Sequence, residues 1–372
     1  MWRSLLLSSP CHNAANPAEA WRYEQRVVAG RWCNRNTHFN YYPTLPFLKV
    51  MRPSVFPYSG YQPRKAVRTS SSPRLSFTPF TAADMPVITP MLEASPSRTC
   101  DFSIGGIYMW TECFDYTRAI VGDTLFIKGL DETDRSKPAF SVPVGAMPLP
   151  EAIALLRDYC RRHSMPLLLS AVPEDRLDEL RALGAYNVEK IPDWADYLYE
   201  LSSLATFSGK KLAKKRNHVN RFMTDHPDAL FRPLTPDNAN EALEFLQRMD
   251  MAEGKSDMAY YERRQVERVL SDFGSYPFEG GLLSVPGKGV VAFTAGEVVA
   301  DTLHVHIEKM DHEVAGAGET ICRNFAAMML ERHPQLVYEN REDDSGDLGL
   351  RKGKQSYHPT ALLMKYNLEL PL

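Results

Sequence analysis

A dense block of charge lies near the carboxyl end, over residues 338–359, which read Y-E-N-R-E-D-D-S-G-D-L-G-L-R-K-G-K-Q-S-Y-H-P. So many acids followed by glycines and bases are seldom needed for folding. A predicted strand at 336–340 and a predicted helix at 347–355 leave three acids on the loop between them, Glu342, Asp343 and Asp344. Carboxylates at the start of a helix suit its positive dipole, and open sheets commonly bind ligands at such loops.

A structural alternative for this block is a capped helix with an ion pair between Asp347 and Arg351, four residues apart. However, unpaired like charges at this density repel each other, so their clustering favours a site that a cationic group joins. We therefore expect the block to bind substrate. The expected substrate-binding residues are Asn340, Arg341, Glu342, Asp344, Asp347, Lys354 and Tyr357, and the expected catalytic residues in the block are Asp343 and Arg351.

A second candidate is the segment 301–309, D-T-L-H-V-H-I-E-K. In a strand, alternate residues share a face, so one layer would receive Leu303, Val305 and Ile307, and the other His304, His306 and Glu308. Three interpretations are open for the polar face: a metal site, a polar wall of a substrate pocket, or histidines that are simply hydrogen-bonded. No fourth ligand can be identified, so no metal is predicted. His306 and Glu308 are expected to be catalytic, as acceptors of a nucleophile's proton.

A third candidate is the basic segment 209–222, G-K-K-L-A-K-K-R-N-H-V-N-R-F. On a helix, one side would carry the apolar residues Leu212, Val219, Phe222 and Met223, and cations would cover most of the rest. A solvated face is the common explanation for such a run. In strongly acidic surroundings it is more typical of a ridge that neutralises nucleic-acid phosphates without reading sequence. The residues expected on this ridge are Lys210, Lys211, Lys214, Lys215, Arg216 and Arg221.

The charged block resembles the signature of a known family. The pattern N-R-E-D-D-x-G-D-x-G-L-R-K-x-K-x-S-Y-H-P is similar to that of the phosphatidylglycerol lysyltransferase carboxy-terminal domain family, and the segments 209–222 and 306–309 resemble the same family. The resemblance runs from about residue 95 to the end and is strongest after residue 197. It implies a tandem of two acetyltransferase-like (GNAT) lobes, whose members move an amino acid from aminoacyl-tRNA onto a lipid headgroup.

The bulk properties suit two domains and a tail. The chain has 372 residues, 44% hydrophobic and 24% charged, as in an ordinary globular protein. No apolar run approaches the roughly 18 residues that a membrane-spanning helix needs, so a lipid substrate would be met from the water side. The six cysteines show no metal-ligand spacing, and the start lacks the apolar region of a signal peptide. A reducing cytoplasm is the simplest location.

Charge is divided unevenly along the chain. Residues 1–84 contain 11 Lys and Arg against 3 acids, a net charge of +8, which leaves −11 for the remainder of a chain whose total is −3. Residues 1–84 also lack sustained periodicity, so we predict a disordered tail. It would be either a basic arm for nucleic acid or a stretch outside the native protein.

The remainder predicts an α/β (α+β) fold of two lobes with mixed central sheets, over residues 85–203 and 204–372. In the first lobe we expect strands at 117–121, 124–128, 166–172 and 197–201, and helices at 149–163 and 174–183. In the second lobe we expect helices at 210–224, 236–252, 259–272, 319–332 and 347–355, and strands at 282–285, 290–295, 301–308, 336–340 and 361–368. The second lobe is expected to carry the site.

Glycines at 316 and 318 precede the predicted helix 319–332, where acetyltransferases of this fold hold the coenzyme A pyrophosphate with backbone N–H groups. Glu313 and Glu319 flank these glycines and would repel a pyrophosphate. Coenzyme A is therefore disfavoured, and no cofactor is expected. The glycines also suit a tight turn without any ligand.

The leading hypothesis is an aminoacyltransferase that moves an amino acid, lysine by resemblance, from aminoacyl-tRNA to a lipid headgroup or another hydroxyl or amine acceptor. Because the tRNA ester is already activated, such an enzyme needs positioning, an anionic pocket for the ammonium, and cations or N–H groups for the oxyanion. The alternatives are an acyl-coenzyme A dependent N-acetyltransferase and a non-catalytic module that binds tRNA or a metabolite. The expected partners are aminoacyl-tRNA and a membrane lipid met from the cytoplasmic side, without a transmembrane segment.

Overall fold

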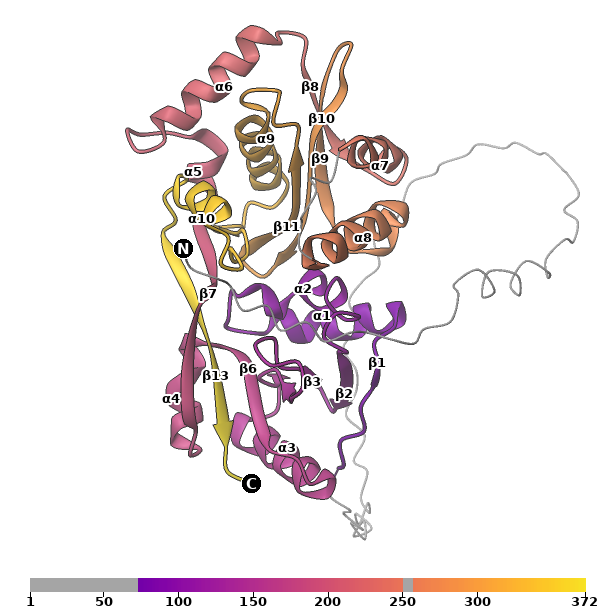
Figure 1. Ribbon diagram of the computed structural model, residues 1–372, viewed down its shortest axis with the longest axis vertical. Coiled ribbons are helices and arrows are strands. Elements are labelled where there is room, and N and C mark those ends of the chain that lie inside the picture. The colour runs from indigo at the N-terminus through magenta and orange to yellow at the C-terminus, as the bar shows by residue number, and fades with distance from the viewer. Residues whose placement is uncertain (1–72, 250–256) are drawn as a thin grey trace, which may run out of the picture. The chain divides into compact units, whose positions relative to one another are not determined.

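The strands of the computed structural model form one continuous mixed sheet. The structure describes residues 73–249 and 257–372, and within them thirteen strands pair in the order β1-β2-β3-β4-β6-β13-β7-β12-β11-β10-β9-β8, with β5 beside β3 (Figure 1). Most of the predicted tail, residues 1–72, lies outside the described residues. The described chain is divided between a first lobe before β7 and a second lobe after it, joined by β7 and β13.

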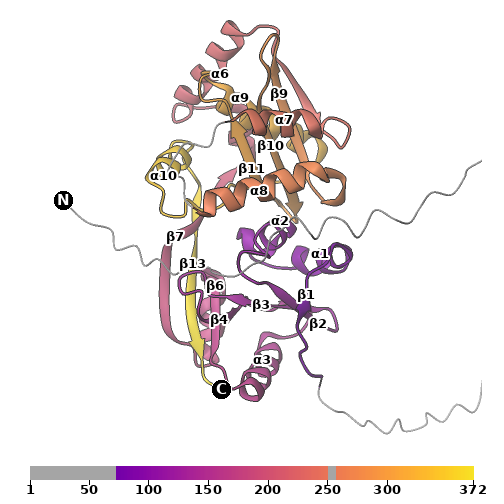
Figure 2. The ribbon, with the colours of Figure 1, turned by 45° about the vertical axis from the view of Figure 1, so that its right-hand side comes forward.

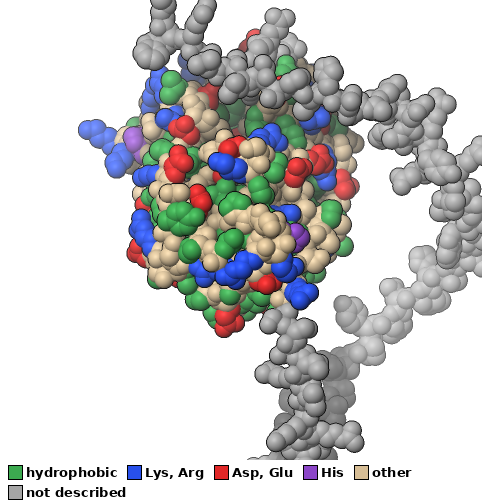
Figure 3. All heavy atoms as spheres, turned by 60° about the horizontal axis from the view of Figure 1, so that its bottom comes forward, with side chains coloured by type: hydrophobic (Ala, Val, Ile, Leu, Met, Phe, Trp, Pro, Cys, Tyr) green, Lys and Arg blue, Asp and Glu red, His purple; other side chains and the backbone are tan. Residues whose placement is uncertain are grey.

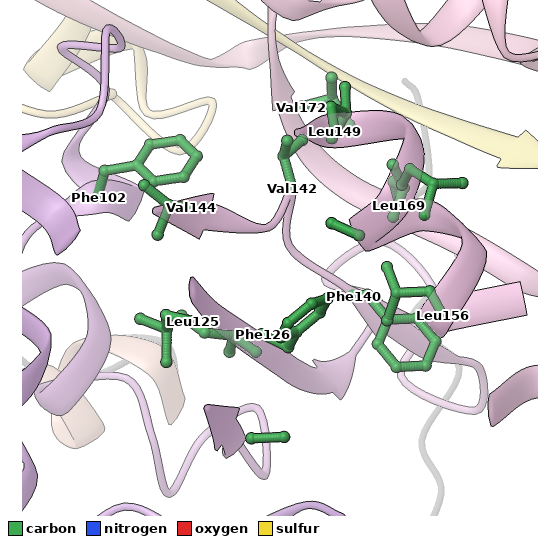
Figure 4. Packing of buried hydrophobic residues seen from close by; sticks show 14 of the residues in the cluster. Phe102, Leu125, Phe126, Phe140, Val142, Val144, Leu149, Leu156, Leu169 and Val172 are labelled. Carbon is green, nitrogen blue, oxygen red and sulfur yellow. The ribbon is translucent and has the colours of Figure 1, made fainter. Parts of the chain in front are cut away.

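The first lobe is built around strands β2 to β6. The strands predicted at 117–121, 124–128 and 166–172 and the helices predicted at 149–163 and 174–183 are found, whereas β4, β5, α1 and α2 were not predicted. Its strands are β1 (Thr78–Pro79), β2 (Thr117–Val121), β3 (Thr124–Leu130), β4 (Pro138–Phe140), β5 (Val144–Gly145) and β6 (Leu167–Pro173). Its helices are α1 (Met85–Glu93), α2 (Ile104–Tyr108), α3 (Leu149–His163) and α4 (Leu177–Ala182), with short 3-10 turns at Ala82–Asp84, Cys100–Phe102 and Glu174–Arg176. Leu156 of α3 packs on Phe140 and Leu169 in the core (Figure 4).

Part of the predicted tail belongs to this core. Leu75 is 3% exposed, and Phe77 lies edge-on to Tyr159 with ring centroids 5.0 Å apart. Asp84 accepts a hydrogen bond of 2.8 Å from Nε of Arg118. Residues 73–84 are therefore ordered, contrary to the prediction of disorder up to residue 84. The prediction was wrong there because an irregular segment can be packed through single anchors, which leave no periodic pattern.

The second lobe repeats the same order of elements. Its strands are β8 (Leu230–Leu234), β9 (Glu279–Val285), β10 (Gly289–Val299), β11 (Thr302–Met310) and β12 (Tyr338–Asn340). Its helices are α5 (Leu201–Thr206), α6 (Ala213–Asp225), α7 (Ala239–Arg248), α8 (Asp257–Ser271), α9 (Ala317–Arg332) and α10 (Leu348–Gln355), with a 3-10 turn at Phe273–Ser275. The boundary predicted between residues 203 and 204 falls inside α5, whose Leu201 and Leu204 are buried in this lobe's core.

The two lobes exchange strands. β7 (Tyr186–Glu200) and β13 (Ala361–Leu370) form a long antiparallel ribbon that runs between them (Figures 1 and 2). The end of β7, the last strand of the first half of the chain, pairs with β12, whereas β13 pairs with β6 of the first lobe. Each lobe's sheet is therefore completed by a strand from the other half of the chain.

Each half of the chain follows the order of an acetyltransferase-like lobe: three antiparallel strands, a helix, a parallel strand, a helix and a final strand. The parallel pairs are brief, with a single pair of residues between β4 and β6 and three between β11 and β12. Adjacent parallel strands that separate so early open a gap in the sheet. In the second lobe, the charged block begins at this gap.

Candidate active site

A buried cluster of ions lies where β11 and β12 separate. Lys365 of β13 places its Nζ 2.8 Å from Oδ1 of Asp196 on β7 and 2.9 Å from Oδ2 of Asp101, which follows Cys100 in the 3-10 turn Cys100–Phe102. The Lys365 Nζ also lies 3.4 Å from Sγ of Cys100. Lys365 and Asp196 are almost completely buried. The exchanged strands bring together groups from positions that are far apart in the sequence.

Opposite charges keep both members of the central pair ionised. Burial alone would lower the pKa of Lys365, but Asp101 and Asp196 raise it well above its ordinary value. Burial would likewise raise the pKa of Asp196, but Lys365 and Asn340 lower it. Asp101 is different, because burial raises its pKa more than Lys365 lowers it. Its Oδ2 lies near the ammonium without an aligned hydrogen bond, so this carboxylate is incompletely neutralised.

Asn340, at the end of β12, connects this cluster to the charged block. Its Nδ2 donates to Oδ2 of Asp196 at 2.8 Å and to the carbonyl of Arg98 at 2.7 Å, while its Oδ1 accepts from the backbone N–H of Glu342 at 2.7 Å. The amide therefore fixes the direction in which the chain leaves the sheet. Asn340 positions the acidic loop.

His306 lies between two carboxylates. Its Nε2 is 2.9 Å from Oε1 of Glu297, and its Nδ1 is 2.7 Å from Oε1 of Glu342. Glu297 also accepts the backbone N–H groups of Ile104 and Gly105, at 3.1 and 2.6 Å. Burial would lower the pKa of His306, but the two glutamates raise it to about 10. His306 is therefore an imidazolium at neutral pH and cannot accept a proton.

A β-bulge in β11 changes which side chains lie on each face of this strand. Ala295 of β10 is opposite Ile307, whereas Gly296 is opposite Val305, so His306 is the extra residue. Leu303 and Val305 consequently pack with α9, while Ile307 packs on the other face with α7 and α8.

The polar residues His304, His306 and Glu308 of β11 are likewise divided between the two faces of the sheet. Glu308 accepts from Arg341, whose Nη1 lies 2.9 Å from Sγ of Cys322 on α9. His304 and His306 lie together, with ring centroids 6.3 Å apart. The prediction that His304, His306 and Glu308 share one face was wrong, because an alternating pattern contains no signal for a bulge. Burial and the charge of His306 lower the pKa of His304 to about 4, so His304 is neutral.

The contacts of these residues do not favour a metal ion. Both ring nitrogens of His306 are taken by carboxylates. Within the described ranges, Cys100, Asp101 and Asp196 are the set whose ligand atoms lie close enough to hold a metal, within 4.8 Å of one another. The ammonium of Lys365 already lies against all three residues. The cluster thus contains its own cation.

The structure divides the acids of the charged block among different partners. Asp344 forms a two-point ion pair with Arg351, at 2.9 and 2.7 Å, and accepts from the hydroxyl of Tyr197 at 2.6 Å. Asp347 caps α10 by accepting from the backbone N–H of Leu350 at 2.8 Å. The predicted helix and its cap are confirmed, but the cation of Arg351 pairs with Asp344 and Asp193 instead of Asp347.

The two expected cations of α10 hold the acidic loop. Lys354 donates to the backbone carbonyl of Arg341 at 2.6 Å and to that of Asp343. Tyr199 in turn donates to the carbonyl of Lys354 at 2.8 Å. Arg351 and Lys354 are thus positioning groups in the observed conformation.

Asp343, on the same loop, accepts its hydrogen bonds from a neighbouring serine. Its Oδ1 accepts from the backbone N–H and the hydroxyl of Ser345, both at 2.9 Å. Burial raises its pKa to about 6 although Lys365 acts in the opposite direction. Burial, with Asp101 and Asp343 adding to it, also raises the pKa of Glu132 to about 7.

A small cavity in the first lobe adjoins this acidic region. Its volume is about 30 Å³, and its polar lining is contributed by Asp101, Tyr116, Glu132, Ser141 and Ser170. Sequence reasoning missed Asp101, Glu132, Asp196 and Lys365. A signal was present for Lys365, because a lone lysine stands inside the apolar strand A-L-L-M-K-Y-N-L. Such a charge is buried only when it is paired.

The basic segment is helical from Ala213, whereas residues 210–212, which were predicted to be helical, form a turn before α6. Only part of the segment is free to meet a ligand. Lys210, Lys211 and Lys214 are exposed. Lys215 is not, because it lies 3.3 Å from Oε1 of Glu319 and 3.7 Å from the ring centroid of Tyr357. Arg216 donates to the backbone carbonyls of Phe207 and Gly209.

The apolar side of this helix also differs from expectation at one position. Leu212, Val219 and Phe222 are buried, but Met223 is 40% exposed. Arg221 is exposed beside Asp225, with its Nε 3.4 Å from Oδ2 of the acid. By contrast, the end of the first lobe that faces forward in Figure 3 mixes cations, acids and hydrophobic side chains among the described residues. The exposed lysines of the segment that remain for phosphate binding are Lys210 and Lys211, in the turn before α6, and Lys214 in its first turn.

The start of α9 is covered by α6. A Cβ atom at Gly316 would lie 2.5 Å from the carbonyl oxygen of His218, and Nδ1 of His218 lies 3.0 Å from Oε1 of Glu319. Tyr357 lies beneath this contact, with the guanidinium of Arg341 5.1 Å from its ring centroid. The N–H groups that hold a pyrophosphate in coenzyme A enzymes of this fold are therefore not accessible here. No helix among the described residues is both long and apolar enough to cross a membrane.

The chain is similar to known proteins in sequence and in fold. The family model described as phosphatidylglycerol lysyltransferase, C-terminal, matches residues 93–369. A crystal structure of a conserved protein of unknown function from Bacteroides thetaiotaomicron is 33% identical, with a TM-score of 0.72 over 80% of this chain and 100% of that one. The C-terminal domain of a putative lysylphosphatidylglycerol synthetase from Agrobacterium fabrum is 14% identical, with a TM-score of 0.54 over 77% of this chain and 91% of that one.

A curated relative, an uncharacterised protein of Mycoplasmoides gallisepticum, is 24% identical over 192 residues. That match covers 49% of this chain and 58% of the relative, which is less than two-thirds of its length. The predicted fold of two tandem acetyltransferase-like lobes is confirmed.

Proposed function

Because this chain belongs to the phosphatidylglycerol lysyltransferase C-terminal family, we propose that it is an aminoacyltransferase that moves an amino acid from aminoacyl-tRNA to a hydroxyl or amine acceptor. The observation that carries the proposal is the buried ion cluster between the lobes. In it, the ammonium of Lys365 faces two carboxylates, Asp196 and Asp101, and burial still raises the pKa of Asp101. A carboxylate that its neighbours neutralise incompletely favours a cationic ligand.

The α-ammonium of the transferred amino acid is the cation that this site would bind. Asp101, Glu132 and Asp343 all have raised pKa values for which burial is the largest cause. A bound ammonium would stabilise their charged forms. Lys365 and Asp196 would keep the acids in place, because each is anchored on a strand of the ribbon.

Asp343 is our candidate for the general base. The acceptor's hydroxyl or amine would lose its proton to Asp343 as it attacks the ester carbonyl, and Asp343 would return this proton to the ribose oxygen of the tRNA as the ester bond breaks. A pKa of about 6 leaves most of this carboxylate ionised at neutral pH, as a base requires. His306 is excluded from this role by its charge, and Glu308 is paired with Arg341 on the other face of the sheet. His306 instead holds the loop through Glu342.

Arg351 and Lys354 support the reaction by position. They fix the loop that carries Asp343, through Asp344 and through two backbone carbonyls. The tRNA would be bound by Lys210, Lys211 and Lys214, which are exposed on one side of the second lobe. Such interactions neutralise phosphates without reading sequence. Because aminoacyl-tRNA is a cytoplasmic substrate, the proposal places the protein in the cytoplasm.

The amino acid and acceptor named by the family description, lysine and phosphatidylglycerol, are the first pair to test. The test incubates the purified protein with tRNA carrying radiolabelled lysine, in vesicles with and without phosphatidylglycerol, and then with other charged tRNAs and with water-soluble amines. We expect transfer of label to one acceptor class. If no charged tRNA loses its amino acid faster with the protein present, whatever the acceptor, the proposal fails.

A further inference from the structure

The small cavity of the first lobe lies where its two parallel strands separate. β4 and β6 pair at a single position, and the residues that follow it on the two strands, Ser141 and Ser170, line the cavity. Ala171 comes next, with a φ of 54°, a backbone conformation that favours glycine. Asn367 of β13 holds this strained wall, because its Oδ1 accepts from the hydroxyl of Ser170 at 3.0 Å and from the N–H of Ala171 at 3.2 Å.

Among the described residues, the lining of this cavity carries two carboxylates and no cation. Asp101 and Glu132 supply the carboxylates, and Tyr116, Ser141 and Ser170 supply hydroxyl groups. Oδ2 of Asp101 is buried without an aligned hydrogen bond, and the hydroxyl of Tyr116 lies 3.3 Å from Oε1 of Glu132. Burial, to which the charge of Asp101 adds, raises the pKa of Glu132 to about 7. The lining therefore offers acceptors and negative charge to a ligand.

The cavity accepts only a small group. Its volume of about 30 Å³ leaves room for about two groups of the size of a water molecule. Apolar side chains close the rest of the wall, namely Ile107, Ile127, Leu130, Ala139 and Phe140. An ammonium and the carbon atom that bears it would fill this space. An ammonium also donates three hydrogen bonds and brings the charge that two carboxylates require.

We propose that this cavity holds the unsubstituted primary ammonium of the donor amino acid and excludes donors whose nitrogen carries an alkyl or acyl group. The inference rests on the proposed function for the choice of an α-ammonium, and it adds a selection among donors that the transfer reaction does not itself require. A substituent would enlarge a group that already fills the space, and an acyl group would also remove the charge. Proline and N-acylated amino acids would therefore be poor donors, whereas the side chain lies outside the cavity.

Calorimetric titration of the full chain without tRNA tests the inference with glycinamide, which carries an α-ammonium and no side chain. We expect glycinamide to bind. N,N-dimethylglycinamide, which keeps the charge but enlarges the nitrogen, should bind about 10- to 100-fold more weakly, because the cavity cannot expand without strain. N-acetylglycinamide, which lacks the charge, should not bind. N-acetyllysinamide carries only a side-chain ammonium, and its binding in place of glycinamide would assign the cavity to a side chain and overturn the proposal.

Two variants and a matched control connect binding to the cavity. Glu132→Gln keeps the size of the side chain but removes its charge, so it should weaken glycinamide binding by about 10- to 100-fold, the effect of one charge-assisted contact. Ser141→Val fills part of the cavity and should weaken binding as well. The control is Glu339→Gln on β12, where binding should not change. Glu339 is also a buried glutamate, with a pKa raised to about 8 by burial, but it does not line the cavity.

The inference fails if glycinamide does not bind, if its dimethyl derivative binds equally well, or if Glu132→Gln binds it as well as Glu339→Gln does. A loss of binding in potassium chloride that does not occur in choline chloride of the same concentration would assign the cavity to a metal cation instead. These results are separate from those of the transfer assay, because glycinamide binding requires neither tRNA nor acceptor. If glycinamide binds as expected but no charged tRNA is a donor, the proposed function fails and the ammonium site remains.

Discussion

At the scale of single residues, Asp343 is the acid on which the proposed chemistry most depends. Replacement by Asn keeps the size of the side chain and an acceptor for Ser345 but removes the charge. We expect Asp343→Asn to lower kcat/KM for aminoacyl transfer by about 10- to 1000-fold, the range of one charge-assisted contact or one electrostatic group. Wild-type activity should fall as the pH is lowered through about 6, because protonated Asp343 cannot accept a proton.

The control is Asp134→Asn. Asp134 accepts from the backbone N–H and the hydroxyl of Ser136, at 3.2 and 2.6 Å, which is the same local turn that Asp343 makes with Ser345. Asp134 lies outside the site, so its variant should transfer normally. Equal activity of both variants over the whole pH range would remove Asp343 from the mechanism.

His306 gives a prediction about stability at the same scale. Its pKa is about 10 in the folded protein and about 6.5 in an unfolded chain. The ion pairs with Glu297 and Glu342 therefore stabilise the fold fully below pH 6.5, and this contribution is lost as the pH rises through 10. We expect a loss of about 2 to 5 kcal/mol in the free energy of unfolding over that range.

Denaturant unfolding at a series of pH values measures this loss. In His306→Gln the carboxylates have no titrating partner, so the variant should be less stable near neutral pH and its stability should fall less steeply from pH 6.5 to 10. Other groups that titrate in this range, such as Glu339 with a pKa of about 8, are present in both proteins and cancel in the comparison. Parallel curves would mean that His306 is not held as an imidazolium.

At the scale of elements, the sequence predicted helices better than the shape of the site. The bounds of α3 were predicted as observed, and α10 was found with its cap at Asp347, because both have periodicity or capping signals within the element itself. The bulge at His306 and the first eleven residues of β7 were missed. Most residues of β7 before Ala195 are exposed, because this part of the strand pairs only with β13. It therefore lacks the alternation of a half-buried strand.

The basic segment at the start of α6 allows a prediction about tRNA binding. The variant K210A/K211A/K214A removes exposed cations that have no role in packing, so it should weaken tRNA binding without changing the unfolding temperature. The slope of log affinity against log salt should become shallower by about 0.7 to 0.9 for each phosphate that the variant no longer neutralises. Filter binding at several salt concentrations gives both quantities.

Two variants separate this effect from a general reduction of positive charge. R161A/R162A removes two cations from the end of α3 in the first lobe and should leave the salt slope unchanged. Lys215→Ala should mainly reduce stability, because this lysine is paired with Glu319 and packs on Tyr357. A salt slope that is the same in K210A/K211A/K214A and wild type would exclude these three lysines from the RNA interface.

At the scale of the whole molecule, the central ion cluster could not be derived from any one segment. Lys365, Asp196 and Asp101 come from β13, β7 and the turn before α2, and they meet only because the lobes exchange strands. The order of strands in the sequence predicts two lobes, but it is the same whether each final strand completes its own lobe or the other one. Pairing between distant strands is set by packing that no local pattern encodes.

The exchange also predicts that the lobes fold as a single unit. Leu368 and Leu370 of β13 are buried in the first lobe's core, and Tyr197 and Tyr199 of β7 are buried in the second lobe's core. A chain that ends at Thr360 would therefore lack an internal strand of the sheet and leave β6 and β7 with unpaired backbone groups. We expect this truncation, and the separate halves 73–203 and 204–372, to be unfolded or aggregated, whereas the chain 73–372 should unfold in one cooperative transition. Calorimetry and circular dichroism test this. Two independent transitions in 73–372, or a folded 73–203 fragment, would show that the exchanged strands are dispensable and that each lobe is stable alone.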